Sequence, residues 1–303
     1  MILAGIIVGL GAALLQAFSY LISRHLLVQE KLGPKDLLLR AHIFMGLISL
    51  AGLPFTWMTP ENTPLFIRGL FVGSLGYFAA QGLFFWSIRH APASRIAPML
   101  GLKLITSAIL MIFIRGEMLL PLQILAVALT VLAAVAVQYS GEKIPLKPLV
   151  GTLSAGVCFG CSDLGISWMC DGLYADASSR SPWVAIHTVL FTYTFIMLPC
   201  LAISLIKEKT PKKLIKKLDG GSLLYATVWL MAMFCLFYTF STVGIVFGGI
   251  VQATRGPLAV FLAVALVSLG WHHLEMQRSR TDFIKQALSA LMMASAMALY
   301  CIA

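Results

Sequence analysis

Charged residues are scarce in this sequence of 303 residues. Lys, Arg, Asp and Glu make up 11% of it, whereas soluble domains contain about 25%. Hydrophobic residues make up 59%, and several apolar runs exceed the roughly 18 residues that indicate a membrane-spanning helix. This composition argues against a water-exposed globule. It favours an integral membrane protein of the all-α class, in which several helices cross the bilayer.

Acidic residues are scarcer than basic residues. The sequence has 12 Asp and Glu against 22 Lys and Arg, so its formal net charge is +10. In a soluble protein this excess would suggest a nucleic-acid partner. Here the basic residues fall mostly in the connections between apolar runs. We therefore expect them to contact anionic lipid headgroups, and we expect no nucleic-acid binding.

Sequence signatures of catalysis and of metal binding are also lacking. There is no HExxH motif, catalytic triad or glycine-rich phosphate loop. Cys158-x-x-Cys161 has no second cysteine pair. His272-His273-x-Glu275 lies in a basic connection without further ligands. We therefore predict a protein that is not an enzyme and that holds no metal or cofactor.

Ten apolar runs are long enough to cross a bilayer, since a helix rises about 1.5 Å per residue and the hydrocarbon layer is about 30 Å thick. The connections between them are short, which predicts one compact membrane domain. The expected spans are 2–23, 37–58, 66–88, 95–114, 119–138, 148–170, 183–206, 221–240, 246–270 and 282–302.

The second half of the sequence repeats features of the first. Pro98 precedes Glu117 by 19 residues, and Pro257 precedes Glu275 by 18 residues. In each case the proline lies early in an apolar run and the glutamate lies just past its end. Weaker agreement joins GLFFW (82–86) to CLFYT (235–239), and LLQAFSY (14–20) to VCFGCSD (157–163).

The repeat predicts two halves of five helices, residues 1–141 and 148–303, joined by the connection 142–147. Because each half has an odd number of spans, the second half must enter the bilayer in the opposite sense. Inverted repeats of this kind are typical of secondary transporters, in which the substrate binds near the midplane between the halves.

The sequence resembles EamA-type members of the drug/metabolite transporter (DMT) superfamily over essentially its whole length. The resemblance rests on LLLRAHIFMGLI (37–48), on Pro98 to Glu117 with LQILAVALTVLAAVAV (122–137), and on Pro257 to Glu275. It implies ten helices around a central cavity, alternating access, and export or exchange of small metabolites such as amino acids. It also implies a multi-pass protein of a bacterial inner membrane, as a monomer or homodimer. One departure is that the second half has His187 where the first has Arg40.

Lys103 is the clearest charge inside an apolar run. A charge at the bilayer centre costs at least ~2.5–3.5 kcal/mol and usually faces a cavity or a partner. Thr106 and Ser107 follow on the same helix face. We interpret Lys103 either as a cation that binds a carboxylate, phosphate or sulfonate of the substrate, or as a structural residue that snorkels or pairs with an acid.

Asp163 and Arg255 are the other charges expected at similar depth, in the sixth and ninth runs. We predict that they pair with each other. Such a pair is either a static contact or a gate or proton relay, with H⁺ as the coupling ion.

Polar and aromatic side chains recur on the runs expected to surround the cavity. Ligand cavities combine aromatic walls with a few polar groups, although aromatic residues in membrane proteins also serve simply for packing. The predicted cavity residues are Gln16, Ser19, Tyr20, Tyr77, Gln81, Lys103, Ser107, Ser162, Trp229, Tyr238, Gln252 and Arg255.

Together these features predict a secondary or exchange transporter that exports a small polar or anionic, amino-acid-like metabolite. One alternative is a multidrug exporter of cationic compounds, which the resemblance associates with a glutamate in the first helix; this sequence has Gln16 there and no acid. The other alternative is a lipid-handling membrane protein. Most Lys and Arg lie in the odd-numbered connections, which by the positive-inside rule places both termini outside, in conflict with the usual topology of the family.

Overall fold

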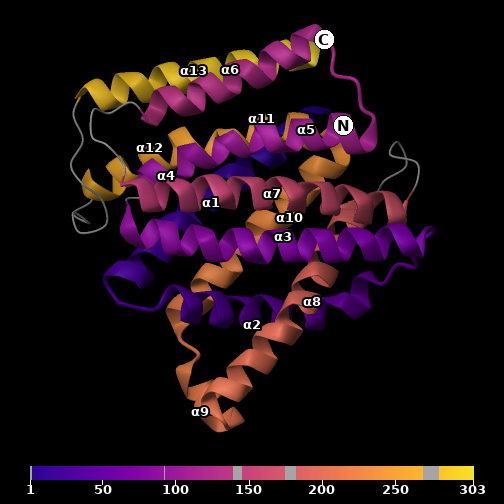
Figure 1. Ribbon diagram of the computed structural model, residues 1–303, viewed down its shortest axis with the longest axis vertical. Helices are drawn as coiled ribbons and strands as arrows, with labels where there is room; N and C mark the ends of the chain where they lie inside the picture. The colour runs from indigo at the N-terminus through magenta and orange to yellow at the C-terminus, as the bar shows by residue number, and fades with distance from the viewer. Residues whose placement is uncertain (1, 92, 139–144, 175–181, 269–279) are drawn as a thin grey trace.

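The computed structural model describes residues 2–91, 93–138, 145–174, 182–268 and 280–303, and within these ranges it is helical (Figure 1). Eight helical segments are long and apolar enough to cross a membrane, and two shorter apolar helices, Pro121–Ala136 and Ala287–Ile302, lie where the fifth and tenth spans are expected. The prediction of an all-helical, multi-pass membrane protein is therefore confirmed. Glu275, the His272–His273 pair and residues 142–144 of the predicted connection 142–147 lie outside the described ranges.

The elements follow one another along the chain with short connections. They are α1 (Ile2–Val28), α2 (Pro34–Gly52), η1 (Leu53–Thr56), α3 (Thr63–His90), α4 (Ala93–Met99), η2 (Leu100–Leu102), α5 (Lys103–Arg115), α6 (Pro121–Gln138), α7 (Leu146–Leu173), α8 (Pro182–Glu208), α9 (Pro211–Lys217), α10 (Gly220–Val243), α11 (Ile245–Ala253), α12 (Arg255–Ser268) and α13 (Arg280–Ile302).

The closest helix packing joins α3 to α7, where glycines let the two backbones touch. A Cβ atom on Gly165 would lie 2.2 Å from the backbone nitrogen of Gly73, and a Cβ on Gly172 would lie 2.6 Å from that of Phe66. Small residues at such contacts allow the van der Waals packing that holds membrane helices together. Since residue numbers rise along one helix as they fall along the other, α3 and α7 are antiparallel.

Helices α2 and α8 form a second antiparallel pair. Asp36 near the start of α2 pairs with Lys207 near the end of α8, and a Cβ on Gly46 would meet the side chain of Met197. Helix α6 lies beside α13 at one edge of the molecule (Figure 1).

Helix α1 packs against α10, also in antiparallel sense. A Cβ on Gly5 would meet Thr242 at the end of α10, and one on Gly221 at its start would meet Leu26. Here the close neighbours are side chains, in contrast to the backbone contacts between α3 and α7.

The fourth and ninth spans are each divided into two helices, where the sequence predicted continuous runs. A proline has no N–H for the helical hydrogen bond and clashes with the preceding turn. Pro98 lies next to the end of α4, and the chain passes through η2 before α5 begins at Lys103. Pro257 lies in the first turn of α12, which begins at Arg255. Two helix N-termini, each with a cationic first residue, therefore lie inside the membrane-spanning runs.

The basic connection after α8, which is expected to contact anionic lipid headgroups, contains a short helix. Residues Pro211–Lys217 form the short helix α9, with proline in its first turn, where its missing N–H and fixed backbone angle suit a helix start. Leu214 is the buried residue of α9, and its lysines are exposed.

Candidate functional site

A small cavity lined by polar and aromatic side chains lies among the helices. Its volume is about 20 Å³, which is room for about one water molecule, whereas pockets that hold metabolites measure about 300–1,000 Å³. A metabolite would therefore need the helices to separate before it could bind. The lining residues are Gln16, Tyr77, Lys103, Phe159, Ser162, Asp163, Ile166, Thr192, Tyr193, Trp229, Met233, Leu236, Phe237, Gln252 and Arg255.

Lys103 and Asp163 form a buried ion pair at this cavity. The Nζ of Lys103 lies 2.8 Å from Oδ2 of Asp163 and 3.0 Å from its Oδ1. Ser107, one turn further along α5, donates a hydrogen bond of 3.1 Å to the same Oδ2. Each charged side chain is 4% exposed. The predicted polar face of the fourth span is therefore directed at α7, and its partner is an acid of that helix.

The predicted pair between Asp163 and Arg255 does not form. Arg255 instead donates from Nη1 to the Oε1 of Gln16, at 3.0 Å, and from Nη2 to the carbonyl of Leu100, at 3.1 Å. The physical reason is the break in the fourth span. Lys103, the residue after the 3₁₀ turn η2, contacts both carboxylate oxygens of Asp163, and the Leu100 carbonyl within η2 accepts from the guanidinium instead.

Several buried polar atoms beside Arg255 have no hydrogen-bond partner within the described chain. They are the Nε of Arg255, the Oε1 of Gln252 and the hydroxyl of Tyr20, on residues that are 3%, 2% and 0% exposed. The Nε2 of Gln252 donates to Gln16 at 3.0 Å. Buried polar atoms are rarely left unpaired, since each such atom loses its hydration. The described ranges also contain no carboxylate paired with Arg255.

Aromatic rings form one wall of the cavity. The indole N–H of Trp229 donates to the hydroxyl of Tyr193 at 2.8 Å. The ring of Tyr77 lies 5.4 Å from that of Tyr193 and 6.1 Å from that of Trp229. His42 packs against Tyr77 at 5.4 Å, and its Nδ1 lies 2.6 Å from the Leu38 carbonyl.

The structure brings most of the predicted cavity residues together. Those that line the cavity are Gln16, Tyr77, Lys103, Ser162, Trp229, Gln252 and Arg255, and Asp163, which was predicted as a gate or coupling residue, lines it as well. Ser19, Tyr20, Gln81, Ser107 and Tyr238 are not among the lining residues. The hydroxyl of Ser19 donates a hydrogen bond to the carbonyl of Gln16, and the side-chain amide of Gln81 donates one to the Tyr225 hydroxyl. The hydroxyl of Ser107 donates to the carboxylate of Asp163. Contact of any of these residues with a substrate stays a prediction.

Sequence reasoning did not predict Thr192 and Tyr193 of α8. The available signal was Thr188 and Thr192, four residues apart on one face of an otherwise apolar run. Their hydroxyls, however, donate to the helix backbone at Val184 and Thr188. Such internal bonds are the common state of Thr in membrane helices, so the signal has little specificity.

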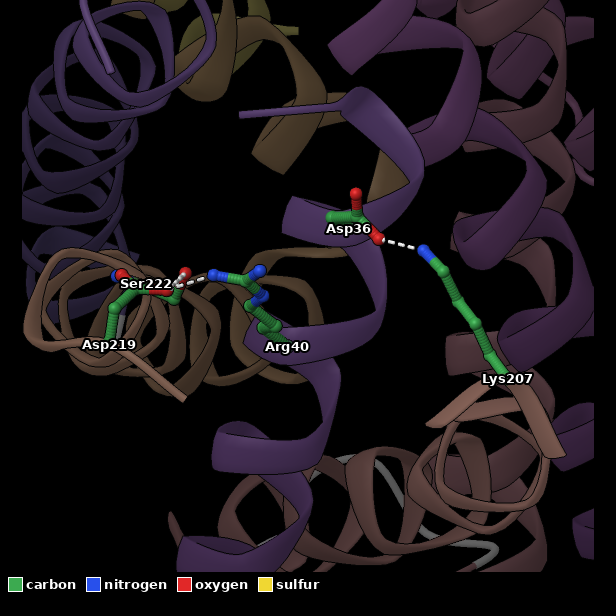
Figure 2. Close-up of polar contacts among 5 residues, drawn as sticks. All are labelled: Asp36, Arg40, Lys207, Asp219 and Ser222. Carbon is green, nitrogen blue, oxygen red and sulfur yellow. Dashed lines mark hydrogen bonds and ion pairs between the residues drawn. The ribbon is translucent and has the colours of Figure 1, made fainter. Parts of the chain in front are cut away.

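Salt bridges from α2 reach two helices of the second half of the chain at the end of the molecule where α2 begins (Figure 2). Arg40 pairs with Asp219 through Nη1 and Oδ2, 2.7 Å apart, and Asp36 pairs with Lys207. Asp219 also caps α10, since its side chain accepts from the backbone N–H of Ser222 at 2.6 Å.

The contact at Asp219 is expected to persist at neutral pH. Partial burial raises the pKa of its carboxyl, but the hydrogen bonds from Ser222 and the Arg40 guanidinium together lower it below the ordinary value of 3.8. A carboxyl with a lowered pKa contributes stability above the unfolded value and loses it as pH falls through the folded one. The contact is therefore lost only in acid.

Polar contacts also join the helices at the opposite end. Arg115, the last residue of α5, contacts Asp171 of α7 and pairs with Glu117 at 3.1 Å. Glu117 of the Pro98–Glu117 spacing therefore contacts the residue that ends the fourth span. His187 bonds the Thr56 carbonyl at 2.9 Å through Nδ1, so it does not reproduce the salt bridge of Arg40.

Comparison with known proteins yields one family and one fold. Residues 3–139 match the EamA-like transporter family, and no curated protein matches the sequence. A solved crystal structure that is 14% identical covers 96% of this chain, and 98% of its own chain is matched, with a TM-score of 0.57. At this identity the likeness establishes the fold alone.

Proposed function

We propose, on the premise that the chain belongs through residues 3–139 to the EamA-like transporter family, that it exports a small anionic, amino-acid-like metabolite by secondary transport. The observation that supports this substrate class best is the burial of Arg255 at the cavity without an acidic partner in the described chain. Arg255 is 3% exposed, it lines the central cavity, and no acid of the described chain pairs with it. A substrate carboxylate would supply the missing charge, since the guanidinium can bind a carboxylate through two hydrogen bonds.

The helix breaks add to the positive potential at this site. Helices α5 and α12 begin at Lys103 and Arg255, and a helix N-terminus has a partial positive charge. Asp163 neutralises Lys103, so one unit of positive charge and two helix dipoles remain. Broken helices whose N-termini face an anionic substrate group are a recurring arrangement in secondary transporters.

The proposal includes two five-helix halves of inverted topology, residues 1–141 and 148–303. If α2 corresponds to α8, the antiparallel packing of these two helices supports opposite senses of insertion. If α1 of the first half corresponds to α7 of the second, and α3 of the first to α10 of the second, then the α1–α10 pair and the α7–α3 pair are equivalent contacts between the two halves. Both pairs are among the most extensive helix contacts in the described chain.

We propose alternating access as the mechanism, because the cavity is too small for a metabolite and polar contacts join helices at both ends of the bundle. Opening the end at α2 would separate Arg40 from Asp219, and opening the other would separate Arg115 from Asp171. A proton taken up by Asp163 would release Lys103, which makes H⁺ the proposed coupling ion.

The proposed orientation places both termini outside the cytoplasm. The connections at the ends of α1, α3 and α8 contain most of the basic residues, and basic connections are retained in the cytoplasm. A reporter that functions only in the cytoplasm, fused after Ala303, should be inactive; an active fusion would contradict this orientation.

A second candidate, export of cationic compounds, is favoured by the aromatic wall alone. Tyr77, Tyr193 and Trp229 present rings of the kind that bind organic cations. Lys103 and Arg255 at the same cavity oppose that candidate, because a cationic ligand would face an unbalanced positive charge.

Metabolite profiling of whole cells tests the proposed function. Cells that express the wild-type protein should release one class of small anionic metabolites into the medium faster than cells that express Lys103→Ala at equal membrane levels. Identical profiles, or a difference confined to organic cations, would contradict the proposal.

A further inference from the structure

A second site lies at the basic end of the molecule, in a groove between the start of α2 and the ends of α3 and α8. Its volume is about 780 Å³, far larger than the central cavity. The lining residues are Gly33, Pro34, Lys35, Asp36, Leu38, Gly82, Trp86, Arg89, His90 and Lys207.

The rim of this groove has a positive net charge. Lys35 and Arg89 are exposed, and the described ranges show no carboxylate paired with either of them. Lys207 pairs with Asp36 across the groove (Figure 2), so these two charges cancel. Two unbalanced cations from α2 and α3 therefore face the same space, an arrangement that complements an anion with several oxygen acceptors.

The floor of the groove is apolar, which distinguishes a lipid from a free anion. Trp86, which is 37% exposed, lies one helical turn before the end of α3. Leu38 of α2 lies opposite Gly82 of α3. A Cβ on Gly82 would lie 3.5 Å from Leu38, in ordinary van der Waals contact, so apolar atoms of α2 and α3 pack closely at this point. Tryptophan is enriched at the depth where headgroups meet acyl chains.

We propose that this groove binds an anionic phospholipid, with the headgroup phosphate between Lys35 and Arg89 and an acyl chain over Trp86. Basic pockets between membrane helices are suited to anionic headgroups. A phosphate held there also lies beside Lys207, and it joins α2, α3 and α8 at the end where α2 contacts the second half of the chain. Bound lipid therefore stabilises the folded protein, independently of which substrate is transported.

The test uses purified wild-type protein in detergent and three probes: phosphatidylglycerol, phosphatidylcholine and inorganic phosphate. Native mass spectrometry measures lipid retained, and a thermal melt measures stabilisation. The wild type should retain phosphatidylglycerol in preference to phosphatidylcholine and should melt at a higher temperature with it. In Lys35→Gln/Arg89→Gln the affinity for phosphatidylglycerol should fall at least about tenfold, because two charge-assisted contacts are lost.

Lys212→Gln/Lys213→Gln on α9 is the matched control, since it removes two exposed charges at the same end of the molecule but outside the groove. It should keep wild-type retention. Trp86→Ala should weaken retention of the lipid without a change in net charge. Equal losses in the groove and control variants would overturn the proposal in favour of general attraction to the basic face. Equal retention of phosphatidylcholine, or equal stabilisation by inorganic phosphate, would overturn it as well.

Discussion

Lys103→Met will lower the thermal stability of the purified protein, and Lys103→Met/Asp163→Leu will restore most of it. The single substitution leaves the Asp163 carboxylate buried with Ser107 as its remaining side-chain partner. Removing one member of a buried ion pair costs about 3–5 kcal/mol, whereas replacing both members with apolar residues is often neutral or stabilising. Thermal unfolding in detergent measures both effects.

Transport by the same variants separates a structural pair from a functional one. If the pair opens during the transport cycle, the double variant will be stable but inactive in proteoliposomes. Wild-type transport by the double variant would show that the pair has only a static role. Wild-type stability of both single variants, Lys103→Met and Asp163→Asn, would show that the pair does not form.

Arg255→Gln will reduce transport by about 10- to 100-fold, and Arg255→Lys will retain part of it. A hydrogen bond to a charged group contributes about 1.5–3 kcal/mol, which corresponds to this loss in rate or affinity. Lysine keeps the charge but lacks the planar fork that reaches Gln16 and Leu100 together. Initial rates in proteoliposomes, normalised to the amount of reconstituted protein, measure the effect.

Arg68→Gln provides the matched control, because it makes the same chemical change at an exposed arginine of α3 that lies over the Trp168 ring. This variant should transport at the wild-type rate. Equal losses in Arg255→Gln and Arg68→Gln would indicate a general effect of removing a positive charge. An unaffected Arg255→Gln would remove Arg255 from the site.

The sequence located most of the cavity because of the cost of polar groups in a bilayer. Gln16, Lys103, Gln252 and Arg255 interrupt apolar runs, and residues of this kind must face a cavity or one another. The prolines at 98 and 257 were equally informative. They marked the repeat, and the structure shows that they also lie beside the breaks in the fourth and ninth spans.

The pairing within the cavity could not be predicted, because it depends on where the fourth span breaks. Similar depth alone suggested Arg255 as the partner of Asp163, and depth does not fix the direction of a side chain. The contact of Arg40 with Asp219 joins residues 179 positions apart, and nothing local to either residue indicates it. Tyr193 was not predicted because tyrosine in a membrane helix usually serves for packing, so its presence alone does not indicate a cavity.

Efflux from proteoliposomes is the most direct test of the central claim, which is that an anion binds at Arg255. Vesicles containing the wild-type protein or Arg255→Gln would be loaded with a defined mixture of isotope-labelled amino acids, dicarboxylates and quaternary ammonium compounds, and efflux would be followed by mass spectrometry. The account predicts that wild-type protein releases one or more of the carboxylates and that Arg255→Gln does not. Release of the ammonium compounds alone, or the same carboxylate release by both proteins, would contradict it.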